Sequence, residues 1–379
     1  MISMPKKKKP AVFLGDFFWS SVPYDGINIL REMEKYLETE VDLLMFDQDI
    51  RLNKRFSGNE KYCFNPEVFR KEKSLKTISS WNDFYAVSAD YSLIATSTHI
   101  SPKTRYPNDI RSNKKCQIAA WDVGGLDILT NAIRFADIFF TKGEAWKSRL
   151  IQDGFQESSA YIAGSPHYDR YTSNELNEIE KSNFFKKYKI DNGNKNILVC
   201  PSNPGSHREQ FDQNLNELEK LINHAKEIKA NVLLKTYPHD YVFFEEEKRL
   251  SGVYKRFYGN KPHYEFLKEK FDELVIIESQ DHHSAIMFCD ALFNMSGSHI
   301  AWETHFSKCK SFSMNYEDKP YFESVSYLKN FQLPDRIYNH NLNRILDIDL
   351  NGKQKHNDNE FIVSINSCKR IAEIVKESL

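Results

Sequence analysis

Short apolar runs alternate with amphipathic stretches along most of the chain. Continuous apolar runs are typical of strands in a parallel sheet, because both faces of such a strand are covered. In the first half these runs are residues 10–19, 41–47, 91–97, 116–122, 136–142 and 160–166. Residues 25–38 instead place Ile27, Leu30, Met33 and Leu37 at a spacing that predicts an amphipathic helix. Strands that alternate with helices predict a parallel sheet with helices on both faces.

The same alternation restarts after residues 170–196, a polar and charged segment that is typical of a helix plus a linker. Amphipathic helices are predicted at residues 214–228 and 361–379. The apolar runs of this half are residues 196–202, 231–238, 273–279, 284–296 and 310–314. The chain therefore predicts two α/β domains of similar size. We place them at residues 1–170 and 196–358, with a linker at 171–195 and a C-terminal helix at 359–379.

Length and charge narrow the class of protein. At 379 residues the chain exceeds the ~250–300 residues at which a single core stops growing. Its 52 Lys and Arg nearly equal its 53 Asp and Glu, so no overall positive field favours nucleic acid as a partner. No apolar stretch reaches the ~20 residues of a membrane-spanning helix. The lysines at positions 6–9 are typical of a solvated tail, and the alternative is attraction to an anionic membrane surface.

Cysteine and histidine usage gives no metal motif. None of the six cysteines forms a CxxC pair, so neither a zinc nor a redox motif is indicated. Cys200 and Cys289 lie in apolar, strand-like runs, where we expect reduced core residues of a cytoplasmic protein. Adjacent histidines rarely face one ion together, so we expect supporting or surface roles for His282 and His283.

The segment SGSHIAWE, residues 296–303, stands between an apolar run and a helix-like pattern. Ligands of parallel α/β sheets bind beyond the carboxyl ends of the strands, so this junction is a candidate site. A glycine flanked by hydroxyls, here Ser296, Gly297 and Ser298 before His299, lets backbone N–H groups approach a phosphate. Glu303 can accept hydrogen bonds from both hydroxyls of a ribose. The alternative is a plain helix cap without a ligand.

Asp122 is a candidate general base at another strand end. It follows the run 116–121 and precedes Gly124 and Gly125, which permit close approach of a substrate. The alternative is that Asp122 caps a helix that begins near Leu126.

Lys235 and His239, in the segment KTYPHD, are candidates to neutralise or protonate a leaving phosphate. The alternative there is a Tyr-Pro turn with an exposed histidine. Other strand-end residues are candidates for contact with an acceptor. These are Asp16, Trp19, His99 and, in the segment PSNPGSHRE, His207 and Arg208.

In their order along the chain, these segments resemble the GT-B glycosyltransferase class, and within it the bacterial capsule and teichoic-acid type transferases. Gly164, Pro166 and Asp169 match a Gly-x-Pro-x-x-Asp segment of the CDP-glycerol glycerophosphotransferase-like group. LLKTYPHD resembles that group's Lys-x-His-Pro segment, but Tyr237 takes the place of the histidine. AAWDVGG takes the place of its Trp-His-Gly segment, with Asp122 for the histidine, which is more similar to CMP-sialic acid and Kdo transferases.

The resemblance implies a GT-B fold, in which two Rossmann-like parallel-sheet domains face each other across a cleft and the last helix packs back on the first domain. It implies a nucleotide-activated sugar as co-substrate, no other cofactor and no metal. Asp122 is then the base and His239 assists the leaving phosphate. The implied donor-binding residues are Lys235, Ser279, Ser296, Gly297, Ser298, His299 and Glu303. The implied acceptor-binding residues are Asp16, Trp19, His99, Gly124, Gly125, His207 and Arg208.

The function expected from these residues is an inverting transfer of a CMP-activated acidic sugar to a glycan or lipid-linked acceptor, in the cytoplasm or at the inner membrane face. A CDP-polyol phosphotransferase and a UDP-sugar transferase are alternatives with the same fold. A non-hydrolysing sugar-nucleotide 2-epimerase is a third, and it needs no acceptor. A non-catalytic member of the class is a fourth, because the Trp-His-Gly and Lys-x-His-Pro residues are replaced.

Overall fold

The computed structural model divides the chain into two compact units. Unit 1 consists of Met1–Thr172 and Asn359–Leu379, and unit 2 of Ser173–Asp358. The segment expected as a linker is thus shared, with residues 171–172 in unit 1 and 173–195 in unit 2. The structure describes residues 8–14, 22–47, 75–97, 106–122, 133–172, 178–201, 211–235, 263–278, 281–295, 300–304, 307, 309–313, 338–339 and 366–379.

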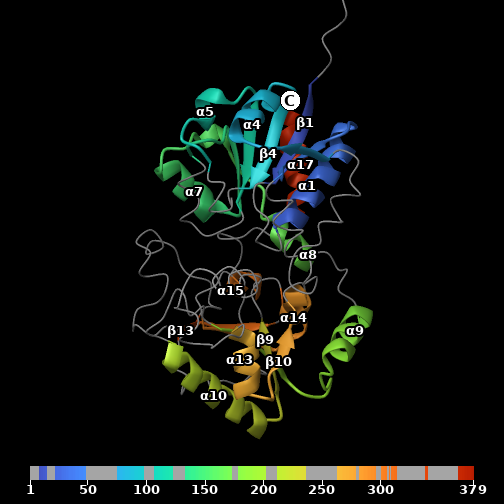
Figure 1. The fold of residues 1–379 in the computed structure, drawn as a ribbon, viewed down its shortest axis with the longest axis vertical. Helices are drawn as coiled ribbons and strands as arrows, with labels where there is room; N and C mark the ends of the chain where they lie inside the picture. Colours follow the sequence, from blue (N-terminus) through green and yellow to red (C-terminus); the bar gives the residue numbers. More distant parts are fainter. Residues whose placement is uncertain are drawn as a thin grey trace, which may run out of the picture. The chain divides into compact units, whose positions relative to one another are not determined.

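Unit 1 is built on a sheet whose described strands follow the order β3-β2-β1-β4-β5-β6-β7 (Figure 1). The strands are β1 (Lys9–Leu14), β2 (Asp42–Phe46), β3 (Leu75–Ile78), β4 (Tyr91–Ser97), β5 (Gln117–Trp121), β6 (Ile138–Thr141) and β7 (Ala160–Ile162). All of these pairings are parallel. The strand order reverses between β1 and β4, as in a Rossmann sheet, and such sheets bind ligands at the carboxyl side of this reversal.

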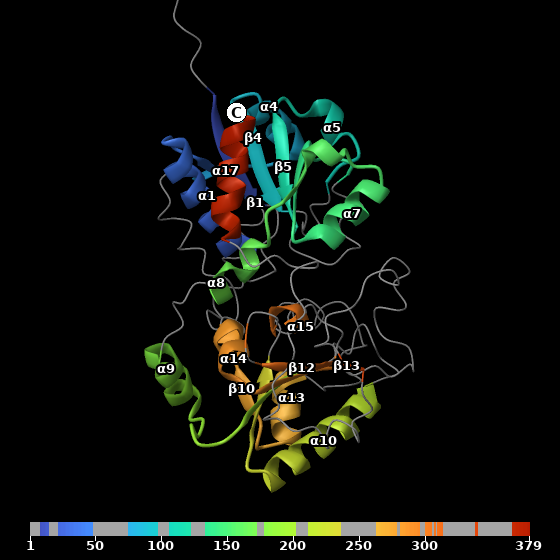
Figure 2. The same cartoon turned by 180° about the vertical axis from the view of Figure 1, so that it is seen from behind.

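Helices cover both faces of this sheet (Figures 1 and 2). Side chains alternate along a strand, so Val12 and Leu14 of β1 point to one face, and Ala11 and Phe13 point to the other. Helices α1 and α17 complete the first core, and α4, α5 and α7 the second. These helices are α1 (Val22–Leu37), α4 (Trp81–Ser88), α5 (Ile110–Asn113), α7 (Glu144–Gln152) and α17 (Ser367–Ser378).

Helix α17, at the end of the chain, lies beside α1 within unit 1 (Figures 1 and 2). Its side chains Ile371 and Val375 are fully buried in the core that α1 also lines. Its first turn is held by Asp169, whose Oδ1 accepts from the backbone N–H of Ser367 and whose Oδ2 accepts from that of Cys368, both at 2.8 Å. A carboxylate at a helix N-terminus satisfies otherwise unpaired N–H groups, so Asp169 fastens the end of the chain to unit 1.

Two glycines of unit 1 are required by their surroundings. A Cβ on Gly26 would lie 2.3 Å from Cδ2 of the buried Leu14, so the glycine lets α1 pack closely on β1. Gly164 has a φ of 76°, in the left-handed region that favours glycine. Pro166 then begins a short 3-10 turn before Asp169. The Gly-x-Pro-x-x-Asp segment therefore has a backbone role at each of its three defined positions.

Unit 2 repeats the topology of unit 1. Its described strands follow the order β10-β9-β8-β11-β12-β13, all parallel, and the order reverses between β8 and β11. The strands are β8 (Asn196–Cys200), β9 (Asn231–Lys235), β10 (Val275–Ile277), β11 (Ala291–Asn294), β12 (Lys310–Ser313) and β13 (Tyr338–Asn339). Helices α10 (Phe211–Glu227) and α13 (His263–Lys270) contribute Leu218, Leu221 and Leu267 to a core that contains Val199, Leu234 and Phe293 of the sheet.

The polar segment before β8 contains α8 (Asp169–Thr172) and α9 (Glu178–Tyr188), and α9 is fixed to the rest of unit 2. Lys187 Nζ lies 2.7 Å from the Glu278 carboxylate and 2.5 Å from that of Asp281. The Tyr188 hydroxyl donates to Asp281 at 2.5 Å and accepts from the backbone N–H of Glu278 at 3.1 Å. Burial and the nearby Asp281 carboxylate raise the pKa of Tyr188, so its hydroxyl remains a donor at neutral pH. These contacts hold the turn after β10 in place.

The apolar run 284–296 has the composition of a strand, but it does not form a single strand. Its first part belongs to helix α14 (His282–Phe288), and only its second part forms β11. The prediction that Cys289 lies in a strand was wrong, because Cys289 lies in the connection between these two elements. Residues 282, 285, 286 and 289 are buried, which is the i, i+3, i+4, i+7 spacing of a helix with one covered face.

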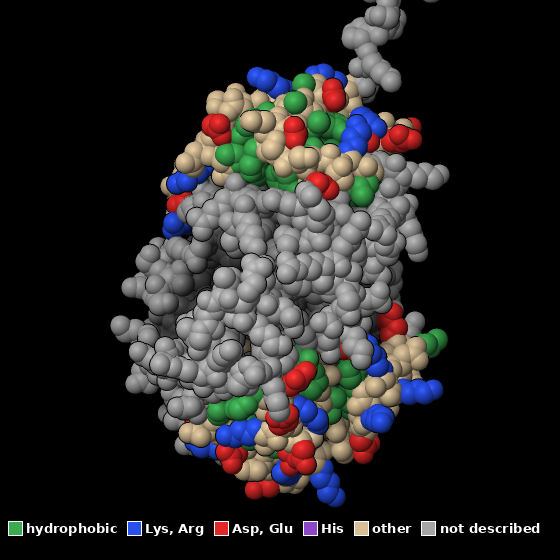
Figure 3. Space-filling view, viewed as in Figure 1, with side chains coloured by type: hydrophobic (Ala, Val, Ile, Leu, Met, Phe, Trp, Pro, Cys, Tyr) green, Lys and Arg blue, Asp and Glu red, His purple; other side chains and the backbone are tan. Residues whose placement is uncertain are grey.

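On the described surface of each unit, charged side chains of both signs are interspersed (Figure 3). This distribution agrees with the balance of 52 basic and 53 acidic residues. Within the part of the chain that the structure describes, no helix combines the length and apolar character needed to cross a membrane.

Candidate functional site

Two neighbouring strand ends of unit 1 place a carboxylate beside an ammonium group. Asp122 follows β5 directly and Lys142 follows β6, and these strands pair in parallel. Lys142 Nζ lies 3.5 Å from Oδ2 of Asp122, and the side chains of Lys142 and Asp122 are 4% and 0% exposed. The ammonium group also lies over the Trp146 ring, 4.8 Å from its centroid. The lysine stabilises the ionised carboxylate at a position with almost no contact to solvent.

This arrangement suits a proton acceptor. A general base must be deprotonated before it receives a proton, and a neighbouring cation favours that state of Asp122. Lys142 was not among the predicted site residues, although it ends the run 136–142 as Asp122 ends the run 116–122. The same inspection of strand ends would have identified it.

A second buried carboxylate of unit 1 also escaped the sequence analysis. Asp25 lies in the first turn of α1, is fully buried, and has an Oδ2 atom 3.9 Å from Nδ1 of His167. Helix α1 follows β1, so Asp25 is on the connection that leaves the point of strand reversal. The surrounding sequence, YDGINIL, is that of an ordinary amphipathic helix, which gave no signal for a buried charge.

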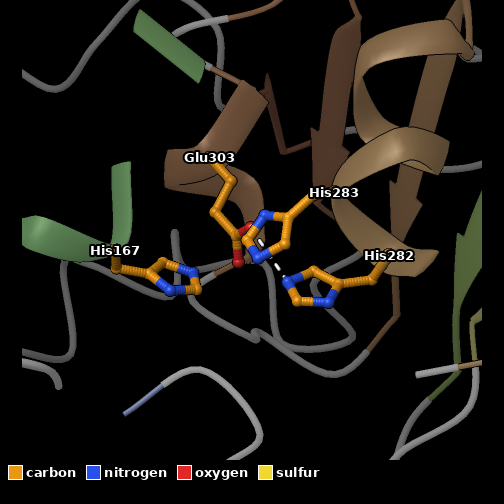
Figure 4. Close-up of side chains that lie close together, drawn as sticks. All are labelled: His167, His282, His283 and Glu303. Atoms are coloured by element: carbon orange, nitrogen blue, oxygen red, sulfur yellow. Dashed lines mark ion pairs between the residues drawn. The ribbon is translucent and has the colours of Figure 1, made fainter. Parts of the chain in front are cut away.

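In unit 2, two histidines face one carboxylate (Figure 4). Glu303 ends the short helix α15 (Ile300–Glu303), which follows β11, and His282 and His283 begin α14, which follows β10. Nε2 of His282 lies 3.4 Å from Oε2 of Glu303, and Nδ1 of His283 lies 3.7 Å from the same oxygen. The ring centroids of the histidines are 3.8 Å apart. The three residues are 6–7% exposed, so a surface role for the histidines was the wrong expectation.

Lys235 is the last residue of β9 and is 9% exposed. It therefore stands at the carboxyl edge of sheet β10-β9-β8-β11-β12-β13, where a bound ligand is expected. Ile277 ends the neighbouring strand β10 and is buried. The structure thus describes Asp122, Lys235 and Glu303 among the predicted site residues. The remaining predicted site residues lie outside the described ranges, namely Asp16, Trp19, His99, Gly124, Gly125, His207, Arg208, His239, Ser279, Ser296, Gly297, Ser298 and His299.

Helix α15 (Ile300–Glu303) is a short helix. It has four residues, so aligned peptide dipoles add little positive potential at its start.

Two buried thiols of unit 2 are poor nucleophiles and poor metal ligands. Burial raises the pKa of Cys289 and of Cys309 well above that of a free thiol, because the thiolate is not solvated there. Their side chains act as small core residues, as expected for reduced cysteines.

Comparisons with solved structures place the chain in a known fold. No protein-family model matches the chain, and no curated protein matches it in sequence. The UDP-GlcNAc 2-epimerase from Methanocaldococcus jannaschii superposes with a TM-score of 0.61 at 15% identity, over 97% of this chain and 99% of that one. The S. aureus MnaA–UDP structure gives 0.60 at 14% identity, over 98% and 96%.

A third similar structure is the wall teichoic acid polymerase TagF, here the H548A variant. It superposes with a TM-score of 0.56 at 12% identity, over 98% of this chain and 89% of that one. At such identities the likeness shows the fold alone. The chain has the GT-B fold, with two Rossmann-like parallel-sheet domains, and it resembles teichoic-acid type transferases in architecture.

Proposed function

We propose that this protein is a nucleotide-sugar-dependent glycosyltransferase of surface polysaccharide or glycan synthesis, with a CMP-activated acidic sugar as donor. The observation that carries the proposal is the buried carboxylate of Glu303. It lies just after β11, the strand next to the reversal of strand order in unit 2. A carboxylate can accept two hydrogen bonds, and a ribose offers two adjacent hydroxyls as donors.

The second part of the proposal concerns the chemical step. Asp122 accepts the proton of the acceptor hydroxyl while that oxygen attacks the anomeric carbon and the bond to the nucleotide phosphate breaks. Lys142 supports this role, because it keeps Asp122 ionised before the reaction. Attack from the face opposite the departing nucleotide inverts the configuration of that carbon.

Stabilisation of the leaving nucleotide is assigned to side chains rather than to a metal. Lys235 supplies a positive charge at the end of β9, and His239 donates a hydrogen bond or a proton to the phosphate. Ser296, Gly297 and Ser298 contribute hydroxyl and backbone donors. The acceptor is a glycan or a lipid-linked glycan, and in the lipid-linked case the protein works at the cytoplasmic membrane face.

A nucleotide screen tests the donor half of the proposal. Melting of the full chain is followed in EDTA with CMP, CDP, UDP or GDP, and we expect the cytidine nucleotides to raise the melting temperature most. A ligand at 100 times its Kd adds ~2.7 kcal/mol to the free energy of unfolding, which is readily measured. Glu303→Gln should remove most of this shift.

The matched control for that screen is Glu227→Gln, because the Glu227 side chain is 76% exposed on α10 and, within the described residues, pairs with His224 alone. It should retain the full nucleotide shift. If none of the four nucleotides changes the melting temperature, or if Glu303→Gln leaves the shift intact, the donor site is wrongly assigned.

A sugar-nucleotide 2-epimerase is the second candidate, because solved structures with that activity in their names superpose over 97% or more of this chain. An epimerase needs no acceptor, whereas a transferase does, and this difference allows a direct test. The full chain is incubated with UDP-GlcNAc alone, and the sugar is analysed for inversion at C2. Formation of the epimer, together with a thermal shift by UDP only, would replace the transferase proposal.

A further inference from the structure

The cluster of His282, His283 and Glu303 has the composition and spacing of a metal site. We propose that these three residues bind one divalent transition-metal ion of the Zn²⁺ type. Figure 4 shows the two imidazoles and the carboxylate pointing toward one another from α14 and α15. Their ligand atoms lie within 4.8 Å of one another.

The spacing of the ligand atoms carries the proposal. Both imidazole nitrogens approach Oε2 of Glu303, at 3.4 Å for His282 and 3.7 Å for His283. Direct N–H···O hydrogen bonds are usually about 2.7–3.2 Å long. Zn–N and Zn–O bonds of about 2.0–2.2 Å at a tetrahedral angle instead separate two ligand atoms by roughly 3.3–3.6 Å. Octahedral angles would bring them to about 3 Å, so the arrangement favours four-coordinate Zn²⁺.

The types of donor atom exclude other common ions. Imidazole nitrogen is a ligand for Zn²⁺, Co²⁺, Ni²⁺ and Cu²⁺, whereas Mg²⁺ and Ca²⁺ prefer oxygen ligands throughout. Glu303 supplies one negative charge and the histidines bind as neutral groups. The side chains of all three are 8–9% exposed, so the cluster is largely shielded from bulk water, and a water molecule or an anion would complete four-coordination.

Supporting or surface roles were expected for this pair from the sequence, because adjacent histidines rarely face one ion together. Here the pair opens the helix, and its rings lie 3.8 Å apart with planes inclined by only 38°. The two residues therefore share one direction, toward α15. No CxxC or spaced histidine motif is needed, because the third ligand comes from the next βα connection.

If the proposed function is correct, the metal site has a consequence for it. Only this consequence rests on the proposed function, and the metal site itself does not. Glu303 cannot give the same oxygen to a metal ion and to a ribose. Zn²⁺ and the donor nucleotide should therefore compete, so the metal acts as an inhibitor rather than as a cofactor of the transfer step.

The test is Zn²⁺ binding by the full chain without nucleotide. The protein is freed of metal with EDTA, the chelator is removed, and Zn²⁺ is titrated by calorimetry. We expect one saturable equivalent. His282→Ala and His283→Ala should each weaken it by at least about tenfold, and Glu303→Gln should abolish it. Titration with Co²⁺ reports geometry, since four-coordinate Co²⁺ absorbs visible light far more strongly than six-coordinate Co²⁺.

The matched control is His224→Ala, which removes a histidine that faces a carboxylate at 3.5 Å but has no second histidine beside it in the described structure. This variant should bind Zn²⁺ like the parent chain. Circular dichroism and melting without metal verify that each variant is folded. Should any of them fail to fold, the pair His282→Gln and His283→Gln replaces the alanines, since glutamine keeps a polar side chain but is a poor Zn²⁺ ligand.

The outcomes separate the two proposals. Equal Zn²⁺ affinity in the parent chain and the His282 and His283 variants would overturn the metal site, whatever the nucleotide screen shows. One lost equivalent in those variants supports the metal site even if no nucleotide binds. When both ligands bind, a Zn²⁺ affinity that falls as nucleotide is added supports the shared carboxylate, and an unchanged affinity removes Glu303 from the donor site.

Discussion

Asp122 of unit 1 and Glu303 of unit 2 are both buried carboxylates, but their partners differ. In unit 1, Asp122 faces Lys142, whose Nζ lies 3.5 Å from Oδ2 of the carboxylate. In unit 2, Glu303 faces two imidazoles, which are neutral or charged according to pH and can bind a metal. Asp122 therefore lies beside a lysine. Glu303 lies beside two imidazoles, which can change their charge with pH or bind a metal ion together with the carboxylate. That difference suits a base in unit 1 and a ligand site in unit 2.

The largest effect is expected when the charge pair of unit 1 is broken. Lys142→Met leaves Asp122 charged and buried, so we expect a loss of about 3–5 kcal/mol in the free energy of unfolding of unit 1. Urea denaturation measures it. The control Lys195→Met breaks a partly exposed pair with Asp290, at 3.1 Å, and should cost less than about 1 kcal/mol. A loss as small as that of the control would show that Asp122 has other compensation.

A smaller effect is expected when Asp169, which holds the first turn of α17 in unit 1, is replaced. Asp169→Ala removes the acceptor of two backbone N–H groups at the start of α17, and we expect a loss of about 1–2 kcal/mol. Hydrogen exchange should become faster in α17 and α1 but not in α10 of unit 2. The control Asp153→Ala changes a carboxylate that pairs only locally with Arg149 in the described structure. Equal acceleration in both units would contradict the assignment of α17 to unit 1.

Acid should remove the stabilisation that Asp42 gives to unit 1. Burial alone would raise the pKa of Asp42, but hydrogen bonds from Lys76, Lys9 and Tyr91 outweigh it and hold the pKa below the ordinary value of 3.8. Near that pH the native state thus binds fewer protons than the unfolded state. The stabilisation is complete above the ordinary pKa and is lost as pH falls through the lowered one.

The Asp42→Asn variant isolates this contribution. It should be less stable than the parent chain by about 1 kcal/mol at neutral pH, because Lys76 and Lys9 still reach solvent. The difference should shrink as pH falls below 3.8. Urea denaturation of both proteins across that range is the measurement, and a difference that stays constant would mean that the native carboxyl has an ordinary pKa.

The smallest effect is expected in unit 2. Glu303→Gln replaces the carboxylate by an amide of the same shape, whose oxygen can still accept a hydrogen bond from an imidazole. We expect the free energy of unfolding to change by less than about 1 kcal/mol in EDTA. A loss of the size expected for Lys142→Met would mean that Glu303 depends on its charge as strongly as Asp122 does, and the contrast between the two sites would then disappear.

Strands with continuous apolar sequence were predicted well, because burial on both faces leaves a local signature. The run 91–97 coincides with β4, and the run 41–47 contains β2. Strand β3 (Leu75–Ile78) was missed because it lies at the edge of the sheet, where Lys76 and Thr77 are exposed and only Ile78 is buried. The run 284–296 was ambiguous because a short buried helix and a strand have the same composition.

For the candidate site, too, the sequence predicted some residues and missed others. Asp122, Lys235 and Glu303 were predicted from the sequence because strand ends can be located along the chain, and the structure describes all three as buried residues. The partners of two of these residues were not found. Lys142 reaches Asp122 through strand pairing, and His282 and His283 reach Glu303 from a different βα connection.

The sequence by itself determined the alternation of strands and helices, the parallel character of the sheets and the positions where polar groups follow buried strands. These properties depend on which side chains avoid water, and neighbours along the chain record that preference. Only the tertiary structure decided which strand ends lie side by side, that α17 packs on α1, and that two adjacent histidines face Glu303. Such contacts join residues far apart in the chain, and their energies depend on distance and burial that no local pattern encodes.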